Sequence, residues 1–183
     1  MQELSLNVLD IAQNSVRAKA TLVTITVTER SADHYLEISI ADDGCGMSEE
    51  QVARVMDPFF TTRTTRKVGL GIPFFKLTAE STGGSFDIQS TLGKGTVTTA
   101  RYHTDHIDMM PLGDMNATIL SLISMNPQMD FVYRRSLDNN SFTLDTRELK
   151  AVLEDVPINS PEVVQFMKET LQEGESEILN QNT

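Results

Sequence analysis

The chain has 183 residues, long enough for one domain of ordinary size with a smaller addition, and its single Cys excludes an internal disulfide. Most of the formal net charge of -11 lies in residues 104–183, which carry 14 Asp and Glu against 5 Lys and Arg; this argues against a nucleic-acid partner, because phosphate binding needs clustered cations. The chain has no run of 18 apolar residues and no basic secretory start, so we expect no membrane partner and a cytoplasmic location.

An amphipathic helix is predicted over residues 3–18, where apolar side chains recur at helical spacing. A separate line of polar residues on one face of this helix consists of Glu3, Asn7, Asp10, Asn14 and Arg17. A solvated stripe is the simplest interpretation. However, Asn and Asp are poor formers of helix interiors, and a row of Asp, Asn and Arg suits a hydrated metal and phosphates.

Two strands with alternating apolar residues follow, at residues 22–28 and 35–41, and the second delivers Asp42 at its end. A carboxylate there can accept a hydrogen bond from the exocyclic amine of adenine, a donor that guanine does not offer at that position. Gly44 and Gly46 would let the backbone pass close beneath a base and a sugar. A plain Asp-Gly turn after a strand is the alternative interpretation.

A glycine pair at a helix start predicts a phosphate site. Gly69 and Gly71 precede a helix whose free backbone amides can hold phosphate oxygens, and Arg63, Arg66 and Lys67 just upstream could reach over them. The alternative here is a flexible surface loop in front of a helix.

The first helix would supply groups for the phosphates. The amide oxygen of Asn14 is a good ligand for a Mg²⁺ that phosphates and waters otherwise hold. Asp10, one turn earlier, could orient or deprotonate an attacking water or hydroxyl. Arg17, one turn later, could neutralise phosphate charge.

The remaining elements are expected in the following order: a helix over 48–56 with Ser48 as its N-cap, a helix from Gly71 to Thr82, a strand pair over 85–90 and 96–102, a linker over 103–116, a helix over 117–124, a hairpin over 131–135 and 142–144, helices over 146–154 and 161–173, and a frayed polar end over 175–183.

Together these motifs resemble the GHKL superfamily of ATP-binding domains, named for gyrase, heat-shock chaperones, histidine kinases and mismatch-repair ATPases. Residues 4–102 look most like the catalytic ATP-binding domain of sensor histidine kinases. Four sequence boxes carry the resemblance: Leu9 to Arg17 (N box), Asp42 to Met47 (first glycine box), Asp57 to Thr62 (F box) and Gly69 to Ile72 (second glycine box). A closing strand pair contains Thr96, where the family's Thr lies near the adenine.

The resemblance covers a little over half the chain and implies the fold. It implies an α/β protein of the α+β kind, a two-layer sandwich of a mixed sheet against helices. Residues 1–103 would form the ATP-binding domain, and residues 104–183 a small acidic α+β appendage with a linker, a hairpin and two helices.

The resemblance also implies ATP and Mg²⁺ as cofactors. Asp10 would be the catalytic residue and Asn14 the metal ligand. The implied nucleotide site consists of Asn14, Arg17, Asp42, Gly44, Gly46, Met47, Phe60, Arg63, Lys67, Gly69, Leu70, Gly71 and Thr96.

Three departures from the family pattern bear on the activity. Where the kinases usually carry Asn this chain has Asp10, and an acidic side chain favours activating water or a Ser or Thr hydroxyl over phosphorylating a His. Lys67 stands in place of the leading glycine of the second glycine box, and the loop over residues 61–68, which corresponds to the family's lid over the phosphates, is short. The helices that carry a kinase's phospho-acceptor His are not recognised, since neither His103 nor His106 lies in a convincing helix.

The sequence therefore predicts Mg²⁺-dependent ATP binding, with hydrolysis of ATP or transfer of its γ-phosphoryl group to a partner protein in trans. An ATP-gated interaction switch without catalysis is the alternative, and a structural domain with decayed boxes is a third interpretation. A homodimer is left open.

Overall fold

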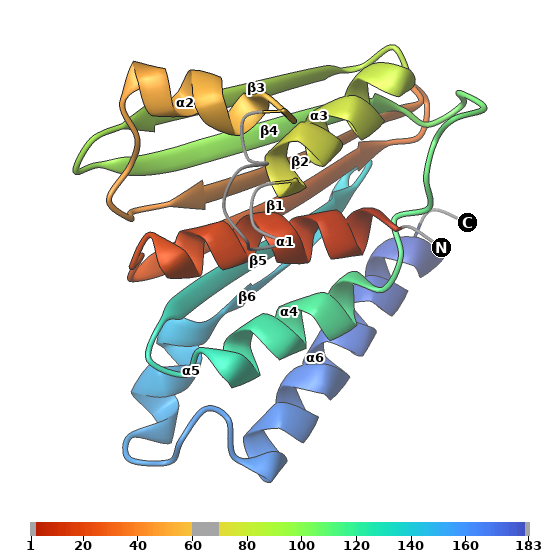
Figure 1. Ribbon diagram of the computed structural model, residues 1–183. Helices are drawn as coiled ribbons and strands as arrows, with labels where there is room; N and C mark the ends of the chain where they lie inside the picture. The colour runs from red at the N-terminus through yellow and green to blue at the C-terminus, as the bar shows by residue number, and fades with distance from the viewer. Residues whose placement is uncertain (1–2, 60–69, 182–183) are drawn as a thin grey trace.

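One mixed sheet of six strands runs through the protein (Figure 1). The computed structural model describes residues 3–59 and 70–181. Its strands are β1 (Leu22–Arg30), β2 (Tyr35–Asp42), β3 (Ser85–Thr91), β4 (Gly95–His103), β5 (Asp130–Leu137) and β6 (Asn140–Asp145). They lie in the order β3-β4-β2-β1-β5-β6, and β1 and β5 pair in parallel whereas the other described neighbours are antiparallel.

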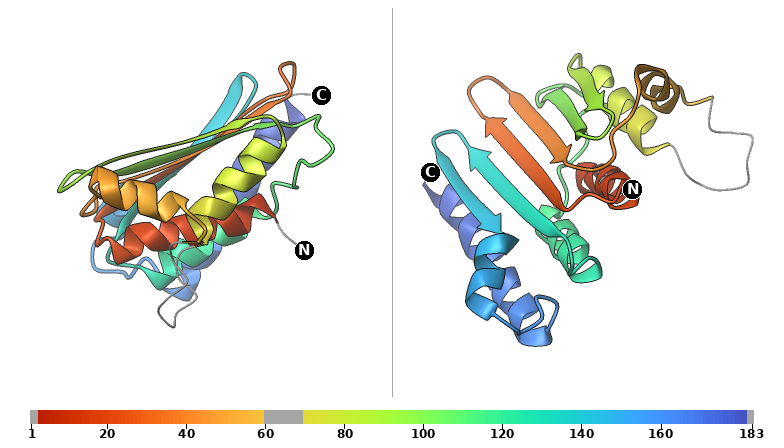
Figure 2. Two further views of the ribbon diagram at one scale, coloured as in Figure 1. Left: turned by 45° about the horizontal axis from the view of Figure 1, so that its top comes forward. Right: turned by 90° about the vertical axis from the view of Figure 1, so that its left-hand side faces the viewer.

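The helices of the described ranges are α1 (Leu4–Arg17), α2 (Glu49–Met56), α3 (Gly71–Ser81), α4 (Met115–Met125), α5 (Thr146–Leu153) and α6 (Pro161–Asn180). Helix α1 lies between α3 and α4 on one face of the sheet (Figures 1 and 2). None of these described helices has both the length and the apolar composition that crossing a membrane requires.

Alternation along the strands explains why the helices cover one face. Val23, Ile25 and Val27 of β1 are at most 1% exposed, while the threonines between them are half-buried on the other face. Leu4, Val8 and Ile11 of α1 meet this apolar face and are at most 3% exposed. The predicted two-layer sandwich of a mixed sheet against helices is confirmed.

The start of α1 depends on the segment that follows β4. No side chain caps this helix, so its first backbone N–H groups need other acceptors. The carbonyl oxygens of Pro111 and Leu112 accept from the N–H groups of Leu4 and Ser5, at 3.0 and 2.8 Å. The predicted linker therefore completes the N-terminal helix.

Strands β5 and β6 extend the same sheet, on the far side of β1. Arg135 of β5 is 6% exposed and donates from Nη2 to Glu29 Oε2 of β1 at 2.6 Å. Thr146, at the start of α5, accepts from the N–H of Phe131 at 2.8 Å. The division into two domains after residue 103 stays a prediction, and the sheet itself continues across that point.

The predicted frayed end after residue 175 is wrong, because α6 continues to Asn180. Gly174 lies inside this helix, and a Cβ at this position would meet Cγ of Phe142 at 2.6 Å, so the aromatic ring requires a glycine there. Leu171 and Ile178, on either side of Gly174, are buried at 0% and 2% exposure.

We expect Ile178→Ala to lower the free energy of unfolding by about 2 to 5 kcal/mol, because it removes a buried side chain and leaves a cavity. The neighbouring Leu179 is 50% exposed, and Leu179→Ala should change stability by no more than about 0.5 kcal/mol. Urea unfolding of both variants measures this difference, and equal small effects would mean that the last turns of α6 contribute nothing.

Candidate functional site

A cavity of about 330 Å³ lies between α1, the ends of β2 and β4, and the start of α3. Its wall is mostly apolar, with Ile11, Ile40 and Ile72 among the lining residues. Polar side chains are few and come from three elements. A mostly apolar hollow with a few placed polar groups is typical of a small-molecule site.

The carboxylate of Asp42 lines this cavity and is held in place by hydrogen bonds. Ser15 of α1 donates its hydroxyl to Asp42 Oδ2 at 2.6 Å, and the backbone N–H of Gly44 donates to Oδ1 at 2.9 Å. In the sheet Asp42 pairs directly with Thr96 of β4, and both residues line the cavity. The carboxylate is therefore held from two sides, beside a threonine.

Neighbouring protein atoms leave no room for a side chain at the two glycines of the first glycine box. At Gly46 the backbone has a φ of +66°, and a Cβ would lie 2.0 Å from the carbonyl oxygen of Thr91. At Gly44 a Cβ would lie 2.7 Å from Cβ of Ala18 on the segment after α1. Both glycines let the loop pack tightly, and Gly46 together with Met47 lines the cavity.

Asn14 lines the same cavity and is engaged by Arg17. The guanidinium Nη2 of Arg17 donates to Asn14 Oδ1 at 2.9 Å, and Arg17 itself is exposed. Among residues 3–59 and 70–181, no group of three His, Cys, Asp or Glu side chains is placed to hold a metal ion. A metal at Asn14 would thus need most of its ligands from a bound molecule.

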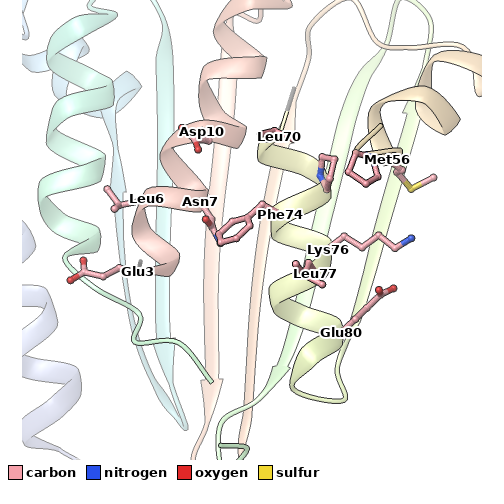
Figure 3. Close-up of a pocket in the computed structure, with 12 residues that line it drawn as sticks. Glu3, Leu6, Asn7, Asp10, Met56, Leu70, Phe74, Lys76, Leu77 and Glu80 are labelled. Carbon is pink, nitrogen blue, oxygen red and sulfur yellow. The ribbon is translucent and has the colours of Figure 1, made fainter. Parts of the chain in front are cut away.

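Asp10 faces a different hollow. Together with Leu70 it lines a groove of about 570 Å³ between α1 and α3 (Figure 3). A Cβ on Gly71 would lie 3.3 Å from Cβ of Asp10, so the second glycine box packs directly on this turn of α1. Asp10 and Asn14, one turn apart, therefore line two different hollows.

The predicted site residues divide as follows. Asn14, Asp42, Gly46, Met47 and Thr96 line the cavity together. Gly44 and Arg17 contact residues of that wall, whereas Asp10 and Leu70 line the groove. Phe60, Arg63, Lys67 and Gly69 lie outside the described residues.

Ser15 is a site residue that the sequence pattern does not reveal. Its spacing groups it with the apolar line of the first helix, and it is 3% exposed as that grouping requires. A buried hydroxyl needs a partner, however, and this need is the signal that a polar group lies opposite.

Asp43 fastens the loop that carries these residues. Its Oδ1 accepts from the N–H groups of Thr21 and Leu22 at 2.7 and 2.9 Å, and its Oδ2 accepts from the Thr21 hydroxyl. Burial alone would raise the pKa of Asp43, but the hydrogen bonds from Thr21 and Leu22 outweigh it and lower the pKa. The charged form thus ties the end of β2 to the start of β1.

Known proteins resemble this chain in sequence and in fold. Residues 1–106 match the model of a family described as histidine kinase-, DNA gyrase B- and HSP90-like ATPases. The sensor histidine kinase ZraS of Klebsiella oxytoca is 35% identical over 92 residues, covering 50% of this chain and 20% of the kinase. Sporulation kinase C of Bacillus subtilis (strain 168) is 34% identical over 91 residues, covering 49% and 21%.

The chain therefore spans about a fifth of the length of these curated relatives.

Among solved structures, the N-terminal domain of a DNA repair protein is similar in fold. The alignment covers 79% of this chain and 53% of that chain, with a TM-score of 0.55 at 12% sequence identity. At that identity the likeness shows the fold alone.

We expect Asp43→Ala to destabilise the protein in a pH-dependent way. Because the folded-state pKa lies below the ordinary value of 3.8, the carboxylate's contribution is fully present above that value and disappears as the pH falls through the folded-state pKa. Urea unfolding should show a clear loss near pH 7 and a smaller one near pH 3. Asp105→Ala, in the exposed turn after β4, is the control; a loss for Asp43→Ala that does not change with pH would contradict the assignment.

Proposed function

Because the chain belongs to the family of histidine kinase-, DNA gyrase B- and HSP90-like ATPases, we propose that the cavity around Asp42 binds the adenine of ATP. The observation that carries this proposal is the Asp42 carboxylate, held by Ser15 and Gly44 in the wall of an otherwise mostly apolar cavity. A carboxylate fixed in this way can accept a hydrogen bond from the exocyclic amine of adenine, and the apolar wall would pack against the base. Thr96 stands beside it as a second polar contact.

Asn14 would hold Mg²⁺ together with nucleotide phosphates and waters. This ion usually keeps several waters and needs few protein ligands, so one amide oxygen fits a metal that arrives with ATP. Arg17, whose guanidinium donates to that oxygen, would turn to the phosphates and leave Oδ1 to the ion. When bound, Mg²⁺ neutralises charge on the phosphates.

Asp10 is our candidate for the base. It lies one turn before Asn14 on α1, and the groove that it lines gives a second molecule access to its carboxylate. The oxygen of a water or of a partner's hydroxyl would bond to the γ-phosphorus while the bond to the β–γ bridging oxygen breaks. ADP then leaves, and the Asp10 carboxylate takes the nucleophile's proton.

We therefore propose Mg²⁺-dependent ATP hydrolysis or γ-phosphoryl transfer to a partner protein in trans. The kinases named among the relatives favour transfer, and the acidic Asp10 favours a hydroxyl or water as the acceptor. ATP as substrate suits a cytoplasmic location.

A second candidate function is an ATP-gated interaction switch without catalysis. It is favoured by the separation of Asp10, in the groove, from Asn14 and Asp42, in the cavity. In that case ATP would change how a partner protein docks, and no phosphate would be released.

Asp42→Ala should weaken ATP binding about ten- to a hundredfold, because a hydrogen bond to a charged group contributes about 1.5 to 3 kcal/mol. Isothermal titration calorimetry with Mg²⁺-ATP measures this change. Asp87→Ala, on the edge strand β3, removes an exposed carboxylate outside the cavity and should leave the affinity unchanged. Equal affinities for wild type and Asp42→Ala would refute the adenine assignment.

The wild-type protein should release phosphate from Mg²⁺-ATP, and Asp10→Asn should slow this release about a hundredfold or more, because it removes a general base. Asn14→Ala, which removes the proposed metal ligand, should also slow release strongly, whereas Asp33→Asn in the β1–β2 turn should leave the rate unchanged. Tight ATP binding without any release by the wild type would instead favour the switch or an enzyme that requires its acceptor.

A further inference from the structure

The groove between α1 and α3 exposes large apolar side chains. Leu6 of α1 and Leu70 and Leu77 at α3 are 49%, 62% and 60% exposed, and all three line the groove. The ring of Phe74 lies between the two helices (Figure 3). Several exposed leucines around one hollow are more typical of a binding surface than of a helix face that contacts only water.

A buried polar group without a partner lies in the same groove. Asn7 is 5% exposed, and its Nδ2 has no hydrogen-bond partner in the part of the chain that the structure describes. The Asn7 side chain points from α1 toward Phe74 (Figure 3). A buried amide N–H without an acceptor lowers the stability of the protein, so a ligand that supplies an acceptor at this point gains binding free energy.

The need for an acceptor indicates what kind of ligand fits. Carbonyl oxygens inside a helix already accept hydrogen bonds, whereas an extended peptide segment offers free ones. To reach Nδ2 such a carbonyl would displace the Phe74 ring, which is half-buried at the groove wall. An extended segment also places its side chains on alternate sides, so one set can pack among the leucines.

Charge around the groove indicates which segment fits. Among the described residues that line it, three carry carboxylates, Glu3, Asp10 and Glu80, and one, Lys76, carries an ammonium group. Asp10 and Glu80 are exposed. This surplus of negative charge attracts basic side chains and repels acidic ones.

We propose that the α1–α3 groove binds an extended, basic segment of a partner protein, with apolar side chains between the leucines and a backbone carbonyl on Asn7 Nδ2. The binding itself does not depend on ATP. If Asp10 acts as proposed above, the segment would also lie beside the base, and in this respect the inference names the kind of partner that approaches the site.

The first test uses a phage library of random octapeptides, selected on the wild-type protein without nucleotide and counter-selected on Leu77→Lys. That variant puts a cation into the groove and removes one of its apolar walls. Enriched sequences should combine Lys or Arg with Leu, Ile or Phe and should lack Asp and Glu. Failure to enrich any sequence that distinguishes the two proteins, or enrichment of acidic sequences, would overturn the proposal.

The second test measures the affinity of the most enriched peptide, made with a fluorophore, by fluorescence polarisation in the absence of ATP. Asn7→Leu removes the amide donor and should weaken binding about two- to tenfold, as one hydrogen bond does. Leu77→Lys should weaken it at least tenfold. Leu92→Lys, in the turn between β3 and β4, changes a leucine of matching exposure at 62% and should have no effect.

Two controls distinguish peptide binding in the groove from misfolding of a variant and from self-association. Thermal unfolding should show Asn7→Leu to be at least as stable as wild type, because an unsatisfied buried donor is gone. Sedimentation should show a monomer, and a dimer that Leu77→Lys dissociates would assign the groove to a second copy of this chain instead. Because the peptide is titrated without nucleotide, its measured affinity tests the groove even if the protein proves not to bind ATP.

Discussion

The hydrogen bond from Ser15 to Asp42 joins the helix layer to the sheet at the centre of the candidate site. Ser15 is buried on α1, and Asp42 ends the strand β2, so the same contact seats the helix and orients the carboxylate. Without Asp42, the buried hydroxyl of Ser15 would lose this hydrogen-bond partner in a place with little access to water. Helix packing and site geometry therefore depend on one another.

Helix α1 also explains why its polar residues line two hollows. Its apolar stripe is committed to the sheet, so its remaining surface is divided between the cavity on one side and the groove toward α3 on the other. Asn14 lies on the first side, and Asn7 and Asp10 lie on the second. A nucleotide and a second molecule could thus approach the same helix without competing for space.

Local patterns predicted most of the helices and strands, because strand alternation and helical spacing are short-range signals, whereas the two-layer arrangement was implied by the family resemblance. They also placed Asp42 at the end of a strand, and the pairing of Asp42 with Thr96 is seen in the structure. Local patterns could not predict packing between distant segments. Gly174 packs against the ring of Phe142 inside α6, and the groove that Asp10 lines is formed by how α3 lies against α1. The position of Ser15 grouped it with the apolar residues of the helix, and the sequence does not show that its hydroxyl bonds to Asp42.

The parallel pairing of β1 with β5 matters for how the chain forms. Leu22 pairs with Asp130, so the contact joins segments roughly a hundred residues apart and has a high loop-closure cost. A ribosome delivers β1 and β2 long before β5 emerges, and until then the nascent chain carries β1 as an open sheet edge. Completion of the sheet is thus a late folding event, and the seam between β1 and β5 is where an immature chain is most exposed to pairing with a neighbour.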